Sequence, residues 1–563
     1  LDDGITTLFE SLHTSNDDPT SLSNRQLAIS DAKNLVTSFR NVGKQLSNQL
    51  KTANNEISEK PAELNAMINQ IFTFNKEIMV AENTSKGVSG ALLDQRDKAI
   101  RDLAAEIDIS TLANENGTIS INLLSGQPLV MQSSITQFQP QPGNPHSDRT
   151  EFVLKIDNNE LKLQDTELGG KVGALFEFRD RAVIPTLREI GQLSLGIADA
   201  FNVQNRMGLN LDGEVGKDIY TIPPTVAKGR EDNSAIGHVV TAKMVQNEGS
   251  ELTTSEYEVE MTSPTTFDVF EIKDGVKSAA LAVTGTFPGP VELDEHGFEL
   301  DFTAAAAAGG FQAGDSFLVN PTLFNMNDFN VAITRPEDLA LASVLSASRD
   351  VNNTTTSELS VTQITDPSLS FTGNALNATA PQKIVVNGAG DYDIFNGSGA
   401  LMGTTSGALY GFDLFANSVP PLNPGVGYEV QMSGKPNPGE TFSLAYNDDA
   451  IADNSNGLRL AGLENQDKLR RNHNKNGETQ MTFSEGISTL ISNVGNKTRT
   501  ARVDAAASDA KLTQSEEWVA STSGVSLDEE AANMVRYEQA YNASAQVVNI
   551  SKEIFDTILN VGR

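Results

Sequence analysis

Histidine is the side chain that most often serves as a metal ligand or a general base near neutral pH, and this chain has few. Its 563 residues contain five, namely His13, His146, His238, His296 and His473. None belongs to an H-E-x-x-H sequence, and no two are spaced as paired ligands of one ion. Cysteine is absent, which excludes thiolate ligands, cysteine nucleophiles and disulfides. We therefore expect no metal site and no cofactor.

One stretch has part of the pattern of a calcium-binding loop. After Gly208, the residues Asn210, Asp212 and Gly213 stand at suitable offsets. Such a loop also needs an acidic residue at its first position and a bidentate glutamate at its twelfth. This chain has Gly208 and Ile219 at those positions, so we interpret the stretch as a turn.

The glycine-rich run Gly169–Gly173 lacks a preceding strand and the G-K-[ST] spacing of a phosphate-binding loop, which favours a turn leading into a helix. No G-x-S-x-G or S-x-x-K sequence occurs in a convincing context. The chain holds 74 aspartates and glutamates, so carboxylate pairs carry no information. We predict no catalytic residues and no enzymatic activity.

The net charge of the chain limits the classes of molecule that it can be expected to bind. A net charge of −33 and a pI near 4.5 argue against nucleic acid and anionic membranes. No window approaches the roughly 18 uninterrupted apolar residues of a membrane-spanning helix, so we expect no membrane insertion. The first residues, Leu1 to Gly4, contain neither an initiator methionine nor the start of a signal peptide, which favours a processed form or a fragment without an N-terminal piece.

Apolar residues recurring at threes and fours predict several long helices that must position any functional surface. The first covers Thr20 to Ile78, and Pro61 should kink or break it near Glu59 or Lys60 because proline removes a donor and crowds the preceding turn. Further helices are predicted over Ala91 to Ile107, over Lys171 to Met207 with Pro185 as a candidate kink, and from Phe483 to Trp518, followed by a loop over 521–525.

Between these helices the pattern changes to period two, which predicts strands at 118–123 and 152–156 and a β-rich region at about 209–450. This region contains an apparent internal repeat. The matched pieces, in the same order, are 267–270 with 392–395, 297–300 with 427–430, and 314–317 with 439–442. They suggest two related β modules, at roughly 220–325 and 360–447.

These elements predict a multidomain α+β protein, in which both ends of the chain form a discontinuous bundle of long helices with inserted antiparallel β domains. The predicted domains are the helical bundle (1–107, 171–208 and 451–525), a small β-rich insertion (108–170), a first β domain (209–345), a second, outer β domain (346–450) and a C-terminal coiled-coil assembly helix (526–563).

The C-terminal stretch has the strongest pattern. Ser526 and Glu529 form a capping box at its start. Alternating steps of four and three give a coiled-coil seam of Leu527, Ala531, Met534, Glu538, Tyr541, Ala545, Val548, Lys552, Phe555 and Leu559. Glu538 and Lys552 lie two heptads apart on this seam, where polar residues often specify register and partner. A terminal helix of this kind needs a partner, and we predict that it mediates assembly.

The sequence also resembles a known family. The stretch Ser523–Glu530, followed by Tyr537–Ala545, is similar to the C-terminal signature of the bacterial flagellar hook-associated protein 1 family. Further similarities lie at Leu92–Asp97, at Gly126–Val130, and from Gly169 through Asp180 to Phe201, Asn202 and Gly208–Gly213. Two departures are the absence of the family's N-terminal helix and a second β module, at about 360–447, without a counterpart in smaller members.

This resemblance implies a structural protein of the flagellum, outside the cell, that forms the hook–filament junction as a ring of subunits joined through terminal helices. The implied partners are the hook protein, hook-associated protein 3, further copies of the chain and a cytoplasmic export chaperone that binds the C-terminal helix. Export would need no cleavable signal peptide. The predicted assembly residues are Leu527, Met534, Glu538, Tyr541, Val548, Lys552, Phe555 and Leu559.

An alternative of another class is a secreted adhesin or glycan-binding protein, in which the repeated β modules bind and the helices form a stalk. It predicts that residues 220–447 alone bind a glycan.

Overall fold

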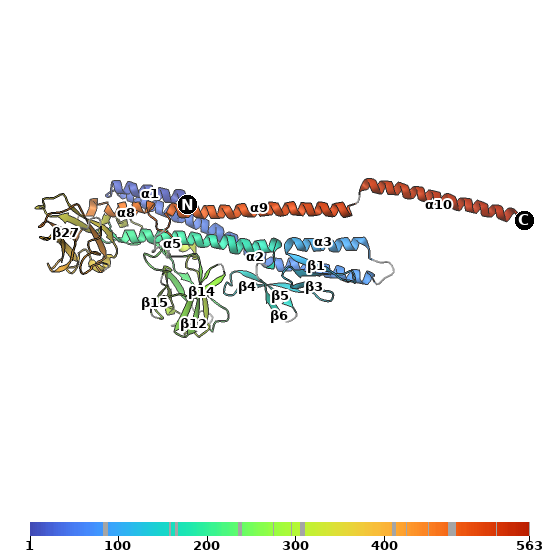
Figure 1. The fold of residues 1–563 in the computed structure, drawn as a ribbon, viewed down its shortest axis with the longest axis horizontal. Coiled ribbons are helices and arrows are strands. Elements are labelled where there is room, and N and C mark those ends of the chain that lie inside the picture. The colour runs from blue at the N-terminus through green and yellow to red at the C-terminus, as the bar shows by residue number, and fades with distance from the viewer. Residues whose placement is uncertain are drawn as a thin grey trace. The chain divides into compact units, whose positions relative to one another are not determined.

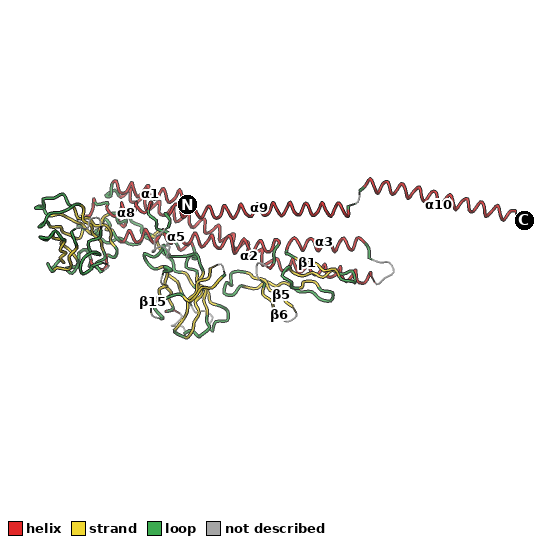
Figure 2. Tube along the Cα trace, in the orientation of Figure 1, coloured by secondary structure: helices red, strands yellow, loops and turns green. Residues whose placement is uncertain are grey.

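A computed structural model describes residues 1–82, 88–156, 159–163, 167–234, 239–273, 275–285, 287–293, 295–304, 310–407, 412–423, 425–448, 450–470, 480–524 and 526–561 (Figures 1 and 2). The chain divides into two compact units, Leu1–Ser492 and Asn493–Arg563, and each is described by itself.

Helices from distant parts of the chain form the central core of the first unit. They are α1 (Asp2–Asp17), α2 (Leu22–Glu82), α5 (Ile184–Arg206), α8 (Ser455–Gly462) and the first turns of α9 (Phe483–Ser523). Their apolar stripes meet in one buried cluster, in which Phe9, Phe201 and Phe483 lie with ring centroids 5.7 to 6.4 Å apart. Segments near the beginning and the end of the first unit therefore share a core.

Of the kink or break predicted at Pro61, the break is wrong, because α2 continues through this residue from Leu22 to Glu82, and the kink stays a prediction. Proline removes one amide from the helical hydrogen-bond series, which is a local loss. Ile57, Leu64 and Ile68, on either side of Pro61, are fully buried in one cluster with the neighbouring strands. Packing on both sides thus outweighs the local cost.

Two small three-stranded sheets cover the second half of α2 together with α3 (Gly90–Glu106). Their strand orders are β1-β2-β3 and β4-β5-β6, all antiparallel. The strands are β1 (Ile109–Ala113), β2 (Ile119–Leu123), β3 (Pro128–Val130), β4 (Gln137–Pro142), β5 (Thr150–Ile156) and β6 (Asn159–Lys162). The helix predicted over Ala91 to Ile107 and the strands predicted at 118–123 and 152–156 are confirmed.

The helix predicted over Lys171 to Met207 is also present, but it contains a change of pitch. It consists of α4 (Gly170–Glu177), a π-helical segment (Phe178–Val183) and α5, with Pro185 in the first turn of α5. Such π segments occur as local bulges within helices. Here the segment carries Arg179, whose Nη1 donates to the Thr150 carbonyl at 2.7 Å and so connects the helix to β5.

The first β module has two five-stranded sheets, in the orders β10-β18-β12-β13-β14 and β15-β16-β17-β11-β9. Its apolar side chains form a separate cluster that also contains Leu195 of α5. The strands are β9 (Thr225–Val226), β10 (Lys228–Gly229), β11 (Thr241–Met244), β12 (Glu256–Ser263), β13 (Thr266–Lys273), β14 (Val276–Ala280), β15 (Val283–Gly285), β16 (Val291–Leu293), β17 (Phe298–Asp301) and β18 (Ser316–Val319).

The second β module has a five-stranded sheet, β21-β27-β23-β24-β25, and the pair β22-β26 around its own cluster. The strands are β21 (Leu345–Arg349), β22 (Glu358–Ile364), β23 (Pro381–Val386), β24 (Tyr392–Asn396), β25 (Leu401–Thr405), β26 (Tyr428–Ser433) and β27 (Thr441–Tyr446).

Several short elements complete the first unit. They are the strand pairs β7 (Gly208–Leu209) with β20 (Ala342–Ser343) and β8 (Tyr220–Thr221) with β19 (Asn330–Val331), the helix α7 (Pro367–Ser370) within the second β module, and 3-10 turns at Met326–Asp328, Pro336–Asp338, Ala450–Ala452 and Leu463–Asn465.

The matched sequence pieces fall on β13 and β24, on β17 and β26, and on β18 and β27. The sheets β10-β18-β12-β13-β14 and β21-β27-β23-β24-β25 also share a hydrogen-bond pattern at the start of β18 and of β27. In the first module Asn233 bonds to the backbone of Ser316, and in the second Asn353 bonds to the backbone of Thr441 in the same two-way manner. This likeness supports the predicted repeat, whereas the predicted domain boundaries remain predictions.

Candidate assembly helix

The C-terminal helix α10 spans Leu527–Val561, close to the predicted limits. At its start the Ser526 hydroxyl accepts from the Glu529 amide at 3.4 Å, and the Ser526 carbonyl accepts from the Glu530 amide at 3.0 Å. Asp528, Glu529 and Glu530 fill the first turn, where negative charge suits the positive end of the helix dipole. The observed start of α10 therefore agrees with the start predicted from the capping box.

The seam predicted on α10 lies in solvent. Leu527, Met534, Tyr541, Val548 and Phe555 are between 63% and 87% exposed, and Glu538 and Lys552 are exposed beside them. Leu559 lies on the same helix, but its side chain is outside the described residues. An exposed row of large apolar side chains marks a surface that binds another protein element. The role of these residues in assembly stays a prediction.

A second apolar face of α10 was not predicted. Val547, Ile550, Ile554 and Ile558 recur at steps of three and four and are 54% to 64% exposed. At about 100° per residue, this face lies roughly 100–120° around the axis from Val548 and Phe555. A search for every stripe of helical period, rather than for one heptad series, would have found it. The last turns of α10 thus present two apolar surfaces.

The helix α9 resembles α10 in its exposure. Within the second unit, every residue from Val494 to Thr522 is exposed, including Trp518. The sequence predicted a loop from residue 521, but α9 continues to Ser523. The hydroxyls of Ser521 and Thr522 donate to the Trp518 carbonyl at 2.7 and 3.0 Å, a local bond compatible with helical backbone.

The two glycine-rich stretches form the predicted turns. The Asn210 carboxamide oxygen accepts from the amides of Asp212 and Glu214, both at 2.9 Å, and Gly213 has a φ of +74°. Gly169 and the residue after it also have positive φ and lead directly into α4. In the described part of the chain, no three His, Asp or Glu side chains are grouped to hold a metal ion.

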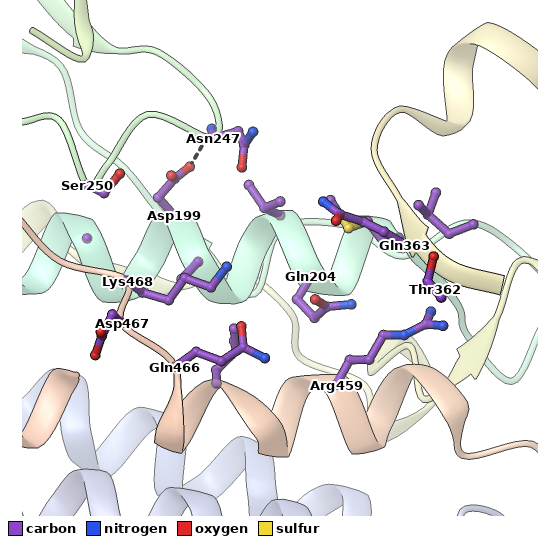
Figure 3. A pocket seen from close by; sticks show the side chains of 16 residues that line it. Asp199, Gln204, Asn247, Ser250, Thr362, Gln363, Arg459, Gln466, Asp467 and Lys468 are labelled. Atoms are coloured by element: carbon purple, nitrogen blue, oxygen red, sulfur yellow. Dashed lines mark hydrogen bonds between the residues drawn. The ribbon is translucent and has the colours of Figure 1, made fainter. Parts of the chain in front are cut away.

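A cavity of about 280 Å³ lies in the first unit, where α5, a loop of the first β module, β22 and α8 meet (Figure 3). On one wall, Asp199 accepts from the amides of Asn247 and Gly249, both at 2.9 Å. Burial raises the pKa of Asp199 despite these bonds. On another wall, Arg459 donates to the Val361 carbonyl of β22. These contacts fasten both β modules to the helices.

The lining of this cavity, as far as described residues form it, contains hydroxyls and carboxamides such as Ser250, Thr362 and Gln204, but no histidine beside a nucleophile. Gln204 donates to Asn456 Oδ1 at 2.7 Å, so it also holds two helices together. The arrangement is that of a structural junction.

Comparisons with known proteins agree with the helical architecture. The model of the flagellar hook-associated protein FlgK helical domain matches residues 1–220, and that of the flagellar basal body rod FlgEFG protein C-terminal region matches residues 519–561. Flagellar hook-associated protein 1 of Salmonella typhimurium is 26% identical over 568 residues, covering 100% of this chain and 81% of the relative. The chain is thus similar to flagellar hook-associated protein 1 along its whole length, and its N-terminal part matches the helical domain of that family.

The Escherichia coli flagellar hook-associated protein 1 is 24% identical over 562 residues, covering 99% of this chain and 79% of that relative. The structure of the flagellar hook junction protein FlgK from Burkholderia pseudomallei has a TM-score of 0.72 and 22% identity, over 93% of this chain and 94% of the other. The predicted α+β class, with long helices and inserted antiparallel β sheets, is confirmed for this chain.

The match at residues 519–561 contains the whole of α10. No helix in the described ranges has the length and hydropathy needed to cross a membrane.

Proposed function

We propose that this hook-associated protein 1 family member is a structural component of the bacterial flagellum at the junction between hook and filament. The relatives that match nearly the whole chain bear hook-associated names. The observation that carries the proposal for this chain is the uncovered seam of α10. The family is one of structural flagellar proteins, and we infer no enzymatic activity for this member.

The seam would drive assembly by burial. Fully burying a large apolar side chain stabilises a complex by about 1.5–3 kcal/mol, so Met534, Tyr541, Val548 and Phe555 together can offset the ordering of a terminal helix. Glu538 and Lys552 would set the register, because a misaligned partner leaves a charge against an apolar surface. Until a partner is present, the exposed helix has little tertiary packing to stabilise it.

The two apolar faces near the C-terminal end support a ring of copies. A single partner helix covers one stripe, and a second face about 100–120° away needs another neighbour. We propose that the seam containing Val548 and Phe555 binds one neighbouring helix and that Ile550 and Ile554 bind a second. In a closed ring every copy supplies and receives the same contacts.

We assign the hook protein and hook-associated protein 3 as neighbours along the flagellum, and a cytoplasmic export chaperone as the partner of α10 before export. A chaperone would cover the apolar faces that otherwise promote aggregation. The absence of cysteine suits passage as an unfolded chain, since no disulfide must form or break. The final location would be outside the cell, reached without a cleavable signal peptide.

The test places charge on the seam. Tyr541→Asp combined with Val548→Asp should abolish junction assembly and motility while leaving the first unit folded, because both side chains are exposed and belong to the second unit. Asn542→Asp combined with Gln546→Asp is the matched control, with the same added charge outside both apolar faces. Normal motility of the first variant, or equal loss in the control, would contradict the seam.

The adhesin alternative finds no support among the relatives, and no feature of the residues described in the two β modules favours it.

A further inference from the structure

The loop between β4 and β5, residues 143–149, reaches across to the first β module. Its Asn144 carboxamide oxygen accepts from the Glu231 amide at 3.1 Å, and its Asp148 carboxylate accepts from Lys228 Nζ at 2.6 Å. Lys228 lies on β10 of the first β module and Glu231 lies just after it, 80 and 87 residues after their partners in the sequence. The loop therefore connects the small sheets on α2 to a module that is otherwise separate in its core.

The centre of this contact is the carboxylate of Glu256 on β12. Three cationic or potentially cationic groups approach its Oε1 atom: His146 Nε2 at 3.3 Å, Arg149 Nη2 at 3.7 Å, and Arg188 of α5. The four side chains are only 14% to 16% exposed, so water screens their charges weakly. One carboxylate here faces two permanent positive charges and one imidazole.

We propose that His146 makes this junction a proton-sensitive latch, which holds the 143–149 loop against the first β module when the imidazole is neutral and releases it when the imidazole is protonated. Protonation adds a third positive charge within a cluster where Arg149 and Arg188 already compensate Glu256. The latch would adjust the position of the first β module without unfolding it, because the module's own core lies elsewhere.

The surrounding charges favour the neutral imidazole in the closed latch. Lys228 on β10 is paired with Asp148, and Asp180 beside α5 is paired with Arg179, so neither acid is free to compensate a new cation. Burial, together with Arg149 and Lys228, lowers the pKa of His146 despite the attraction of Glu256. Burial alone would raise the pKa of Glu256, but His146, Arg188 and Arg149 lower it to about 2.

The direction of the pH effect follows from these contacts. The closed latch lowers the pKa of His146 below its ordinary value of about 6.5, so the closed state binds fewer protons than the open state. Closure is therefore strongest above about pH 6.5 and weakens as the pH falls below it. Each unit of pKa difference between open and closed states gives up to a tenfold rise in the open-to-closed ratio.

The lack of cysteine permits a direct measurement on the full chain. Glu160→Cys on β6 and Ala279→Cys on β14 introduce two exposed sites for spin labels on either side of the latch. Dipolar electron paramagnetic resonance should give one distance population near pH 8 and a second one near pH 5.5. A single unchanged population at both pH values would overturn the proposal.

Three variants test whether the pH-dependent change in distance comes from the latch. His146→Gln cannot be charged and should keep the single population at both pH values, whereas Glu256→Gln should give the second population even near pH 8. His13→Gln, at an exposed site 3.6 Å from Glu464, should respond like the parent chain. Persistence of the pH response in His146→Gln would refute the assignment. Near-ultraviolet circular dichroism of each variant separates latch opening from unfolding, since an opened latch retains the native aromatic signal.

Discussion

The helices α2 and α10 carry similar apolar spacing but differ completely in what covers it. On α2, residues such as Phe39, Ile57 and Leu64 are fully buried, against α1, α5 and the strands. On α10, the corresponding apolar residues are more than half exposed. The spacing shows which side of each helix needs a partner, and only the rest of the chain shows whether that partner is already present. The function proposed for α10 depends on a partner that would cover these exposed residues.

The largest expected difference is at phenylalanines on the two helices. Phe39→Ala should lower the free energy of unfolding of the first unit by about 3–5 kcal/mol, because it opens a cavity beside Phe329, whose ring centroid is 6.1 Å away. Phe555→Ala should leave the unfolding of that unit unchanged. Denaturant titration of the unassembled chain measures both, and equal losses would show that α10 is packed in the monomer.

A smaller effect is expected at a polar contact of α2. Asn75 donates to the Ile119 carbonyl at 2.7 Å and accepts from the Ile119 amide at 3.1 Å, which attaches the helix to β2. Asn75→Ala leaves two backbone groups without these bonds and should cost about 2–4 kcal/mol. The exposed Asn549→Ala on α10 is the control and should cost nothing measurable. Thermal unfolding of both variants measures these costs. An unchanged stability in Asn75→Ala would mean that water replaces the carboxamide.

Glu106, the last residue of α3, extends the contrast between the packed first unit and the exposed α10 to the pH dependence of stability. Burial alone would raise its pKa, but hydrogen bonds from Lys171 and Lys60 lower it. A lowered pKa means that this carboxylate stabilises the fold above about pH 4.3 and that its contribution disappears as the pH falls through the folded-state pKa. Glu106→Gln should cost about 1–2 kcal/mol at pH 7, since Lys171 is largely exposed, and should flatten the acid side of the stability profile. Glu538→Gln, at an exposed position of α10, is the control and should not change the free energy of unfolding at pH 7.

The sequence predicts local features well because their causes are local. Period-two alternation located β2 and β5, and the cap at Ser526 located the start of α10. The continuity of α2 through Pro61 could not be predicted, since it depends on strands far along the chain that pack against Ile57 and Leu64. The latch at Glu256 was equally hidden, because it joins three segments whose proximity exists only in the fold.

The apolar surface of α10 was also predicted only in part. One heptad series identified the seam, but following a single series concealed the second face at Ile550 and Ile554. A helix with one stripe pairs with one neighbour, whereas a helix with two can join a continuous ring. The second face is therefore what the proposed contact with a second neighbour rests on.

The smallest expected effect on the monomer comes from that second face. Ile554→Ala should change the unfolding free energy of the unassembled chain by less than about 0.5 kcal/mol, as for other exposed positions. In assembly it should act independently of Val548→Ala, because the two side chains would face different neighbours, and losses at independent sites add. Sedimentation of the single and double variants measures the coupling. A strongly non-additive double variant would mean that both faces contact one partner and act as a single broad apolar stripe.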